Sequence, residues 1–116
     1  MRQFTSDGYW TSMLRGGLSK VFLLQAMREG PGHGYALARR VEAVSGSYCR
    51  TTLGAVYPAL REFERAGCAR SHVETFGLRR RKIYTLTPKG RAALRAALAA
   101  CETAQGAIRR ALTRTP

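Results

Sequence analysis

Four consecutive basic residues, Arg79-Arg80-Arg81-Lys82, carry the most concentrated charge in the sequence. Guanidinium groups form planar, paired hydrogen bonds with phosphate oxygens and with guanine edges. Adjacent cations repel one another, and such a run favours disorder unless an anion lies against it. The run therefore indicates an anion-binding site, and an ordinary solvated turn is the alternative that the run alone leaves open.

The chain as a whole is basic, which narrows the class of partner. Its 116 residues contain 20 Lys and Arg against 7 Asp and Glu, a formal net charge of +13, and 17 of the basic residues are Arg. Such a charge on one small domain favours nucleic acid, with an anionic membrane surface or an acidic protein as alternatives. Alternatively, the codon usage of a GC-rich genome, which favours Arg, would explain the positive charge without any binding partner.

Patterns typical of catalysis or metal binding do not occur in the sequence. There is no Ser/His/Asp set, no paired carboxylate and no glycine-rich phosphate loop, so we expect neither enzyme activity nor a cofactor. The cysteines, Cys49, Cys68 and Cys101, are widely spaced without zinc-finger partners, so we expect reduced thiols and no structural metal. The chain also lacks a membrane-spanning apolar run and a signal-peptide core, which predicts a cytoplasmic protein.

Apolar periodicity predicts three helices in the first half of the chain, over residues 11–29, 33–45 and 52–65. The apolar residues of the first segment cover most of its circumference, so we expect burial on more than one side. Thr52 is suited to cap the third helix, and Gly67 to follow its last turn. The apolar face that we expect the third helix to bury comprises Leu53, Val56, Tyr57, Leu60 and Phe63.

The period then changes, and two short runs over residues 68–76 and 80–86 flank Gly77-Leu78. This pattern predicts a β-hairpin with the four cations near its turn. Because side chains alternate along a strand, we do not expect all four cations to point outward together. His72 stands alone on the first of these strands.

Thr87-Pro88 is typical of a helix start, and the last helix is predicted to continue to Thr113. Six of its residues have the alternating spacing of a coiled-coil seam: Leu94, Leu98, Cys101, Gln105, Ile108 and Leu112. The chain offers no further element to cover this stripe, so we expect a second subunit to cover it. Packing of this helix back onto the first helix of the same chain is the alternative.

The second and third helices have the proportions of a helix-turn-helix, in which the third would be the recognition helix. Its small, uncharged first turn would allow close entry into a DNA major groove. The residues that we expect on its outer side or just before it are Arg50, Thr51, Thr52, Ala55, Pro58, Ala59, Arg61 and Glu62. With the hairpin as a wing, Arg79, Arg80, Arg81 and Lys82 would straddle the phosphate backbone or probe the minor groove.

Four motifs in this order resemble the PadR family of winged-helix transcriptional regulators. They are Pro31-Gly32-His33-Gly34-Tyr35, Ala55-Val56-Tyr57-Pro58-Ala59-Leu60, Glu64-Arg65-Ala66-Gly67 and the stretch from Arg81 to Gly90. The resemblance covers roughly residues 14–95, and the ordered set is far more specific than any one motif. A proline inside a helix is normally costly, but the family places Tyr-Pro there too, and Gly54 leaves room for the ring.

The resemblance implies a mainly α fold with a small β-hairpin. A winged helix-turn-helix DNA-binding domain would occupy residues 1–87, and a C-terminal dimerisation helix residues 88–116, as in the family's small subgroup. It further implies a homodimer that binds a palindromic operator in double-stranded DNA and usually represses, with no membrane partner. His33, which caps the second helix in the family pattern, and the motif residues Tyr35 and Tyr57 complete the candidate DNA-binding residues.

The effector is open at this stage. Small family members that bind flat drugs use a tryptophan on the C-terminal helix, whereas the single tryptophan here is Trp10, which could line a pocket with Tyr9 and Met13 or simply pack. A thiol-based repressor that senses an oxidant or a soft metal such as mercury through Cys49, Cys68 or Cys101 is an alternative. A non-specific architectural or RNA-binding protein would explain the charge but not the motifs.

Overall fold

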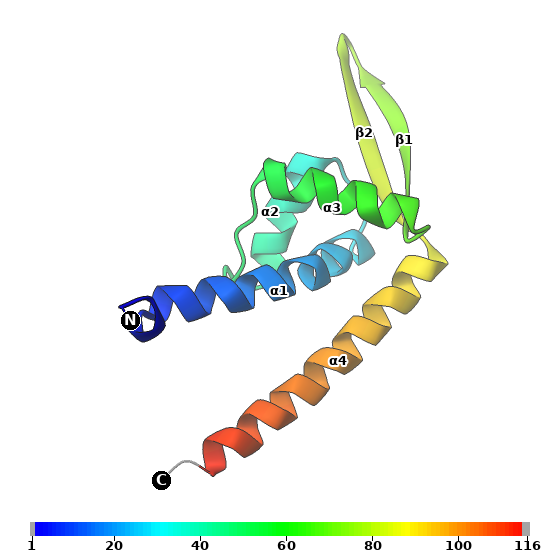
Figure 1. Ribbon diagram of the computed structural model, residues 1–116. Helices are drawn as coiled ribbons and strands as arrows, with labels where there is room; N and C mark the ends of the chain where they lie inside the picture. The colour runs from blue at the N-terminus through cyan, green and yellow to red at the C-terminus, as the bar shows by residue number, and fades with distance from the viewer. Residues whose placement is uncertain (1, 115–116) are drawn as a thin grey trace.

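The computed structural model describes residues 2–114 and is mainly helical, with one two-stranded antiparallel sheet (Figure 1). This is the winged helix-turn-helix that the sequence predicts. None of the described helices is long and apolar enough to cross a membrane. In chain order the elements are the short 3-10 helix η1 (Arg2–Thr5), α1 (Asp7–Arg28), α2 (Gly34–Val44), α3 (Leu53–Arg65), β1 (Ala69–Phe76), β2 (Arg79–Leu86) and α4 (Pro88–Thr113).

One hydrophobic core joins α1, α2, α3, the base of the hairpin and the start of α4. Leu23, Leu37, Leu60, Tyr84 and Leu94 come from these five elements in turn, and all are buried. Helix α1 lies between the α2–α3 pair on one side and α4 on the other (Figure 1), and it contacts both α2 and α4. We call this packed unit, with the hairpin, the body.

Helix α1 differs from the prediction at its start and in its burial. It begins at Asp7, four residues before the predicted start. The aromatic residues 9 and 10 belong to the helix but show no apolar period, so the sequence pattern did not include them. Its second half is buried at Leu23, Leu24 and Met27, whereas Leu14 is 47% exposed. The expectation of burial on several sides is therefore wrong for the first half, since α2 and α3 cross only the second.

The local signals at the helix ends are confirmed. The side chains of His33, Thr52 and Thr87 each accept a hydrogen bond from the backbone N–H three residues later, and so cap α2, α3 and α4. Gly67 has a φ of +80°, and the N–H groups of Gly67 and Cys68 donate to the carbonyl oxygens of Glu64 and Phe63. This is a Schellman ending for α3, which turns the chain into β1.

The hairpin is tied to the helices at its base. Gly32 exchanges two backbone hydrogen bonds with Tyr84, so the segment before α2 lies alongside β2 as a short extra strand. Thr87 Oγ1 donates to the Gly67 carbonyl oxygen at 2.6 Å. A Cβ on Gly90 would lie 2.1 Å from the Cys68 carbonyl oxygen, so the first turn of α4 can approach the hairpin only with glycine there. These contacts fix the angle at which the hairpin leaves the body.

The predicted seam of α4 divides into two parts. Leu94 is 2% exposed and belongs to the core, so the expectation that the chain itself covers none of the stripe is wrong at this position. Leu98 is 45% and Leu112 69% exposed, because α4 diverges from α1 after its first turns (Figure 1). The alternative of packing back on the first helix therefore holds only for the start of α4.

Candidate nucleic-acid interface

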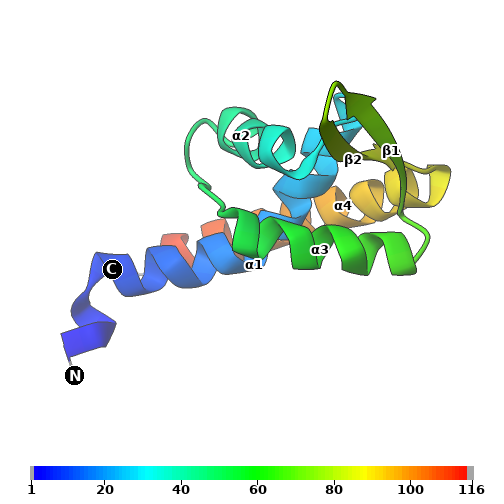
Figure 2. The same cartoon turned by 90° about the horizontal axis from the view of Figure 1, so that it is seen from above.

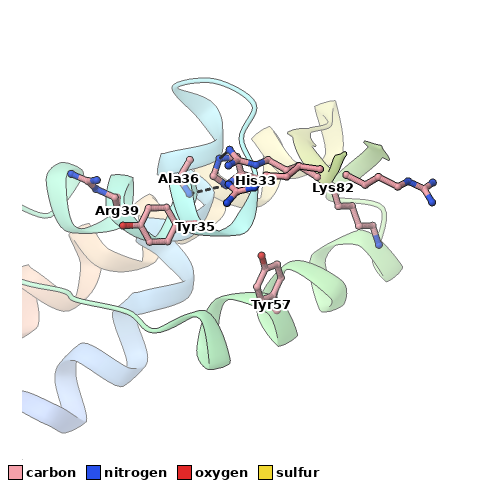
Figure 3. A pocket seen from close by; sticks show the side chains of 9 residues that line it. His33, Tyr35, Ala36, Arg39, Tyr57 and Lys82 are labelled. Atoms are coloured by element: carbon pink, nitrogen blue, oxygen red, sulfur yellow. Dashed lines mark hydrogen bonds between the residues drawn. The ribbon is translucent and has the colours of Figure 1, made fainter. Parts of the chain in front are cut away.

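A basic groove of about 640 Å³ lies between the first turns of α2, the middle of α3 and the distal part of β2 (Figure 3). Five of its residues are cations and two are tyrosines. The lining residues are His33, Tyr35, Ala36, Arg39, Tyr57, Arg79, Arg80, Arg81 and Lys82. The structure thus brings seven of the predicted contact residues into one concavity, from segments more than 20 residues apart in the chain.

The floor of the groove depends on one glycine. A Cβ on Gly34 would lie 2.5 Å from the Tyr57 ring, so the tyrosine can lie against the start of α2 only because position 34 carries no side chain. This contact explains why Gly34 of the first motif accompanies Tyr57 of the second. It sets the spacing of the two helices of the helix-turn-helix.

His33 connects α2 to the hairpin. Its Nδ1 accepts from the Ala36 N–H at 3.2 Å, and its Nε2 lies 2.9 Å from Nη1 of Arg81. Burial lowers the pKa of His33 below its usual 6.5, and the charge of Arg81 lowers it further. A neutral imidazole has one acceptor nitrogen, so while Nδ1 caps the helix, Nε2 carries the proton and faces another donor. Arg81 is therefore held only weakly and can turn to a phosphate.

The four cations of the hairpin have different surroundings. Lys82 Nζ lies 3.5 Å from Glu64 Oε1 and over the Tyr84 ring at 5.6 Å, and Arg81 faces His33. The side chains of Arg79 and Arg80 are exposed and have no ion-pair or hydrogen-bond partner among residues 2–114. As predicted from the alternation, the four do not point outward together.

Arg39 is a groove residue that the sequence analysis missed. Its guanidinium lies over the Tyr35 ring, 6.0 Å from the centroid, and both side chains line the groove from α2. The two residues are four apart on one helix, so they share a face. This spacing, measured from the motif residue Tyr35, is the signal that could have identified Arg39.

The start of α3 offers a small, exposed surface beside the groove. Thr52, Ala55, Pro58 and Arg61 are exposed and Thr51 is half-buried, as expected of a recognition helix. One prediction for this region needs correction, and it concerns the apolar face that we expected α3 to bury.

Leu53 and Tyr57 are exposed rather than buried: Leu53 is 40% exposed on the first turn of α3, and Tyr57 faces the groove. Arg50 Nε lies 3.2 Å from Glu42 Oε1, but the Arg50 side chain is 79% exposed, so its contact with phosphate stays a prediction.

Two acidic side chains hold α3 in place without facing the groove. Lys20 Nζ donates to Glu62 Oε1 at 2.8 Å, and this hydrogen bond, with the lysine charge, lowers the pKa of Glu62. Ser71 donates to Glu64 Oε2, which lowers the pKa of Glu64, and the nearby Lys82 lowers it further. Both carboxylates are therefore charged at neutral pH and link α3 to α1 and to the hairpin.

The other candidate residues lie elsewhere. Cys49 and Cys68 are buried and Cys101 is half-buried, and burial raises the pKa of the Cys49 thiol. No group of three or more His, Cys, Asp or Glu among the described residues could hold a metal ion. His72 is not alone, because its Nε2 lies 2.8 Å from Glu74 Oε2.

Trp10 and Tyr9 pack with Phe4 in an exposed aromatic cluster at the start of α1. The Trp10 indole N–H donates to the Phe4 carbonyl oxygen at 2.9 Å, which ties η1 to the helix. Met13, the third residue of the proposed effector pocket, is also exposed, on the next turn. The cluster lies outside the groove.

Comparison with known protein families gives a match that spans the groove. The model of the transcriptional regulator PadR-like family matches residues 23–96, which include every residue that lines it. No curated protein matches the sequence significantly.

Solved structures of bacterial regulators have the same fold. A PadR family transcriptional regulator from Eggerthella lenta is 28% identical, with a TM-score of 0.78 over 91% of this chain and 94% of that chain. A transcriptional regulator from Clostridium thermocellum is 20% identical, with a TM-score of 0.76 over 85% and 94%. Bacillus subtilis PadR in complex with operator DNA is 25% identical, with a TM-score of 0.62 over 68% of this chain and 45% of that chain.

Proposed function

The chain belongs to the PadR-like family of DNA-binding transcriptional regulators, and from this premise we propose that it is a repressor that binds a palindromic operator as a homodimer. The observation that carries the proposal is the groove in which Arg39 and the hairpin cations converge beside the exposed start of α3. A phosphate backbone lying in this groove would place α3 in the adjacent major groove.

In this arrangement the candidate residues divide by the part of DNA that they contact. Thr51, Thr52, Ala55, Pro58 and Arg61 lie toward base edges or the nearest phosphates, since small side chains permit close approach. The groove residues His33, Tyr35, Arg39, Tyr57, Arg81 and Lys82 bind one strand's phosphates. Arg50 joins them only if it leaves Glu42.

The dimer is formed by the part of α4 that the chain leaves uncovered. Leu98, Cys101, Gln105, Ile108 and Leu112 repeat at coiled-coil spacing, and the three aliphatic side chains among them are exposed. A stripe of this kind in water favours a partner helix. We assign residues 1–87 to DNA binding and 88–116 to dimerisation, with the refinement that Gly90 and Leu94 also complete the core; residues 1, 115 and 116 lie outside the described residues.

We further propose that an effector releases the repressor from DNA. A small molecule held near Trp10 and a thiol reaction at Cys101 are the two routes, and burial with a raised pKa makes Cys49 the poorer thiolate. Treatment of the protein–DNA complex with a thiol reagent or mercury, compared between the native chain and Cys101→Ser, tests the second route.

Electrophoretic mobility shift with DNA upstream of the protein's own gene tests the function. We expect a dimer–DNA complex that survives excess random-sequence competitor and weakens steeply as salt rises. Equal affinity for random DNA would instead favour a non-specific architectural protein. An enzyme is not expected, since the family and the matched structures are transcriptional regulators.

A further inference from the structure

The tip of the hairpin is apolar as well as basic. Gly77 and Leu78 form a two-residue turn between the paired Phe76 and Arg79, and Gly77 has a φ of +61°. Leu78 is fully exposed, and Phe76 is more than half exposed. The hairpin projects away from the helices (Figure 1), and Leu78 lies in the turn that joins its two strands.

The turn itself does not require a leucine at this position. Gly77 supplies the positive φ and Leu78 has none, so the second position accepts many residue types, and a polar one would interact better with water. Leu78 makes no packing contact that would offset its exposure. Single exposed leucines are common on protein surfaces, so the surroundings of this one decide whether it has a role.

Those surroundings are two unpaired guanidiniums. Arg79 lies opposite Phe76 and Arg80 opposite Thr75, so the two arginines are consecutive on β2 and point to opposite faces of the hairpin. Neither has a partner in the part of the chain that the structure describes. The tip is therefore one apolar side chain with a cation on each face.

Building on the proposed DNA binding, we infer that Leu78 inserts into the minor groove of the operator while Arg79 and Arg80 bind the phosphates of its two strands. The minor groove is about 6 Å wide and bordered by phosphates on both sides, which matches a narrow apolar tip between two cations. Apolar side chains that enter this groove partly unstack a base step and kink the duplex.

This insertion gives the protein a source of sequence preference that needs no hydrogen bond to a base. Pyrimidine–purine steps unstack at the lowest free-energy cost, so operators should have such a step where the tip enters. The preference acts at a position remote from α3. It adds indirect readout by the hairpin to direct readout by the recognition helix.

A duplex selected by the native protein from a random-sequence pool serves as the probe. Leu78→Ser should weaken binding to it by about tenfold per subunit, the factor for returning most of a leucine side chain to water. It should also reduce the bend measured by energy transfer between the duplex ends, and leave the slope of log affinity against log salt unchanged. Arg79→Ala and Arg80→Ala should each lower that slope by about one.

Two controls separate insertion from general damage to the hairpin. Val73→Thr changes another exposed apolar residue of the same hairpin, five residues from the tip, and should leave affinity and bend unaltered. Leu78→Met should keep the native affinity and the native bend, since the tip stays apolar. Replacing adenine by 2,6-diaminopurine at the insertion step adds an amino group to the minor groove alone, and should weaken the native protein more than Leu78→Ser.

The outcomes distinguish this inference from the proposed function. If the native protein selects no duplex, DNA recognition itself fails. If it does, and Leu78→Ser binds and bends the probe as the native protein does, the insertion is wrong while the proposed function stands. Loss of self-association in Leu78→Ser, with DNA affinity unchanged, would assign the tip to a protein contact and overturn the inference.

Discussion

The body and the two helical arms that leave it differ in how their apolar side chains are covered. The arms are residues 7–17 of α1 and 98–113 of α4, which extend from the body on the same side (Figures 1 and 2). In the body, Leu37 and Leu60 are fully buried by the chain itself, whereas Met13 and Ile108 of the arms are each about half exposed. The chain completes its helix-turn-helix and hairpin alone, and leaves apolar side chains of both arms exposed.

The charges differ between the two regions as well. In the body, Arg39 and the cations of residues 79–82 all line one groove, although Arg79 and Arg80 lie on opposite faces of the hairpin. In the arm of α4, Arg109 and Arg110 are consecutive, so they point about 100° apart around the helix and share no concavity. A net charge of +13 therefore says less about function than its convergence does.

The largest effect should follow from a charge in the arm rather than in the groove. Ile108→Asp buries a carboxylate in the proposed seam, and should convert the dimer to a monomer. Because two half-sites no longer bind as one unit, operator affinity should fall by about a thousandfold. Sedimentation and mobility shift measure both quantities. Ala107→Asp, which adds the same charge to an exposed neighbour, should change neither; an equal loss there would contradict the seam.

Glycines should respond differently in the two regions. Gly90→Ala in the body places a Cβ against the Cys68 carbonyl oxygen, and should lower the free energy of unfolding by about 3 kcal/mol. A Cβ on Gly16 in the arm of α1 meets no atom within 4 Å, so Gly16→Ala should raise it by up to about 1 kcal/mol through helix propensity. Urea denaturation gives both values. A destabilised Gly16→Ala dimer would show that a partner helix approaches there.

Substituting single arginines in the groove and in the arm should change operator affinity by different, smaller factors. Arg39→Ala should weaken operator binding by about fivefold and lower the salt slope by about one, since one phosphate contact is lost. Arg110→Ala removes the same charge from the exposed arm of α4, and should leave affinity and slope within error. Equal effects would mean that DNA wraps onto the arm, and the contrast between the two regions would fail.

The sequence predicts the structural features that depend on residues close together in the chain. Three helix-end signals depend on residues three or fewer positions away, and all three are as expected: the N-terminal caps at Thr52 and Thr87, and Gly67 after the last turn of α3. The same holds for the hairpin turn at Gly77-Leu78. Such local signals fix the element order and thereby most of the fold.

Contacts between distant segments are where the sequence fails. The approach of His33 to Arg81 spans 48 residues, and no periodicity identifies it. Tyr57 fits the apolar stripe of α3, yet it faces the groove because Gly34 leaves space there. Arg50 appears free in the sequence, but the fold brings Glu42 to it. The candidate site was thus predicted as a set of residues, and its pairings were not.

The smallest expected effect concerns His33, at the junction of the hairpin and the helix-turn-helix. Its pKa is lowered, so the folded protein binds a proton there less readily than the unfolded chain does. The stability from this residue is complete above its usual pKa of 6.5, and is lost as pH falls below that value toward the lowered pKa. Protonation would take Nδ1 from the Ala36 N–H and place a second charge beside Arg81. Urea denaturation of the native chain should therefore show a decline in this window that His33→Asn lacks, because asparagine caps a helix without titrating. Glu62 and Glu64, with pKa values below the usual 4.5, keep their contribution to stability throughout this window and lose it only as pH falls below 4.5. An identical decline in both proteins would assign it to another group and leave His33 with a capping role alone.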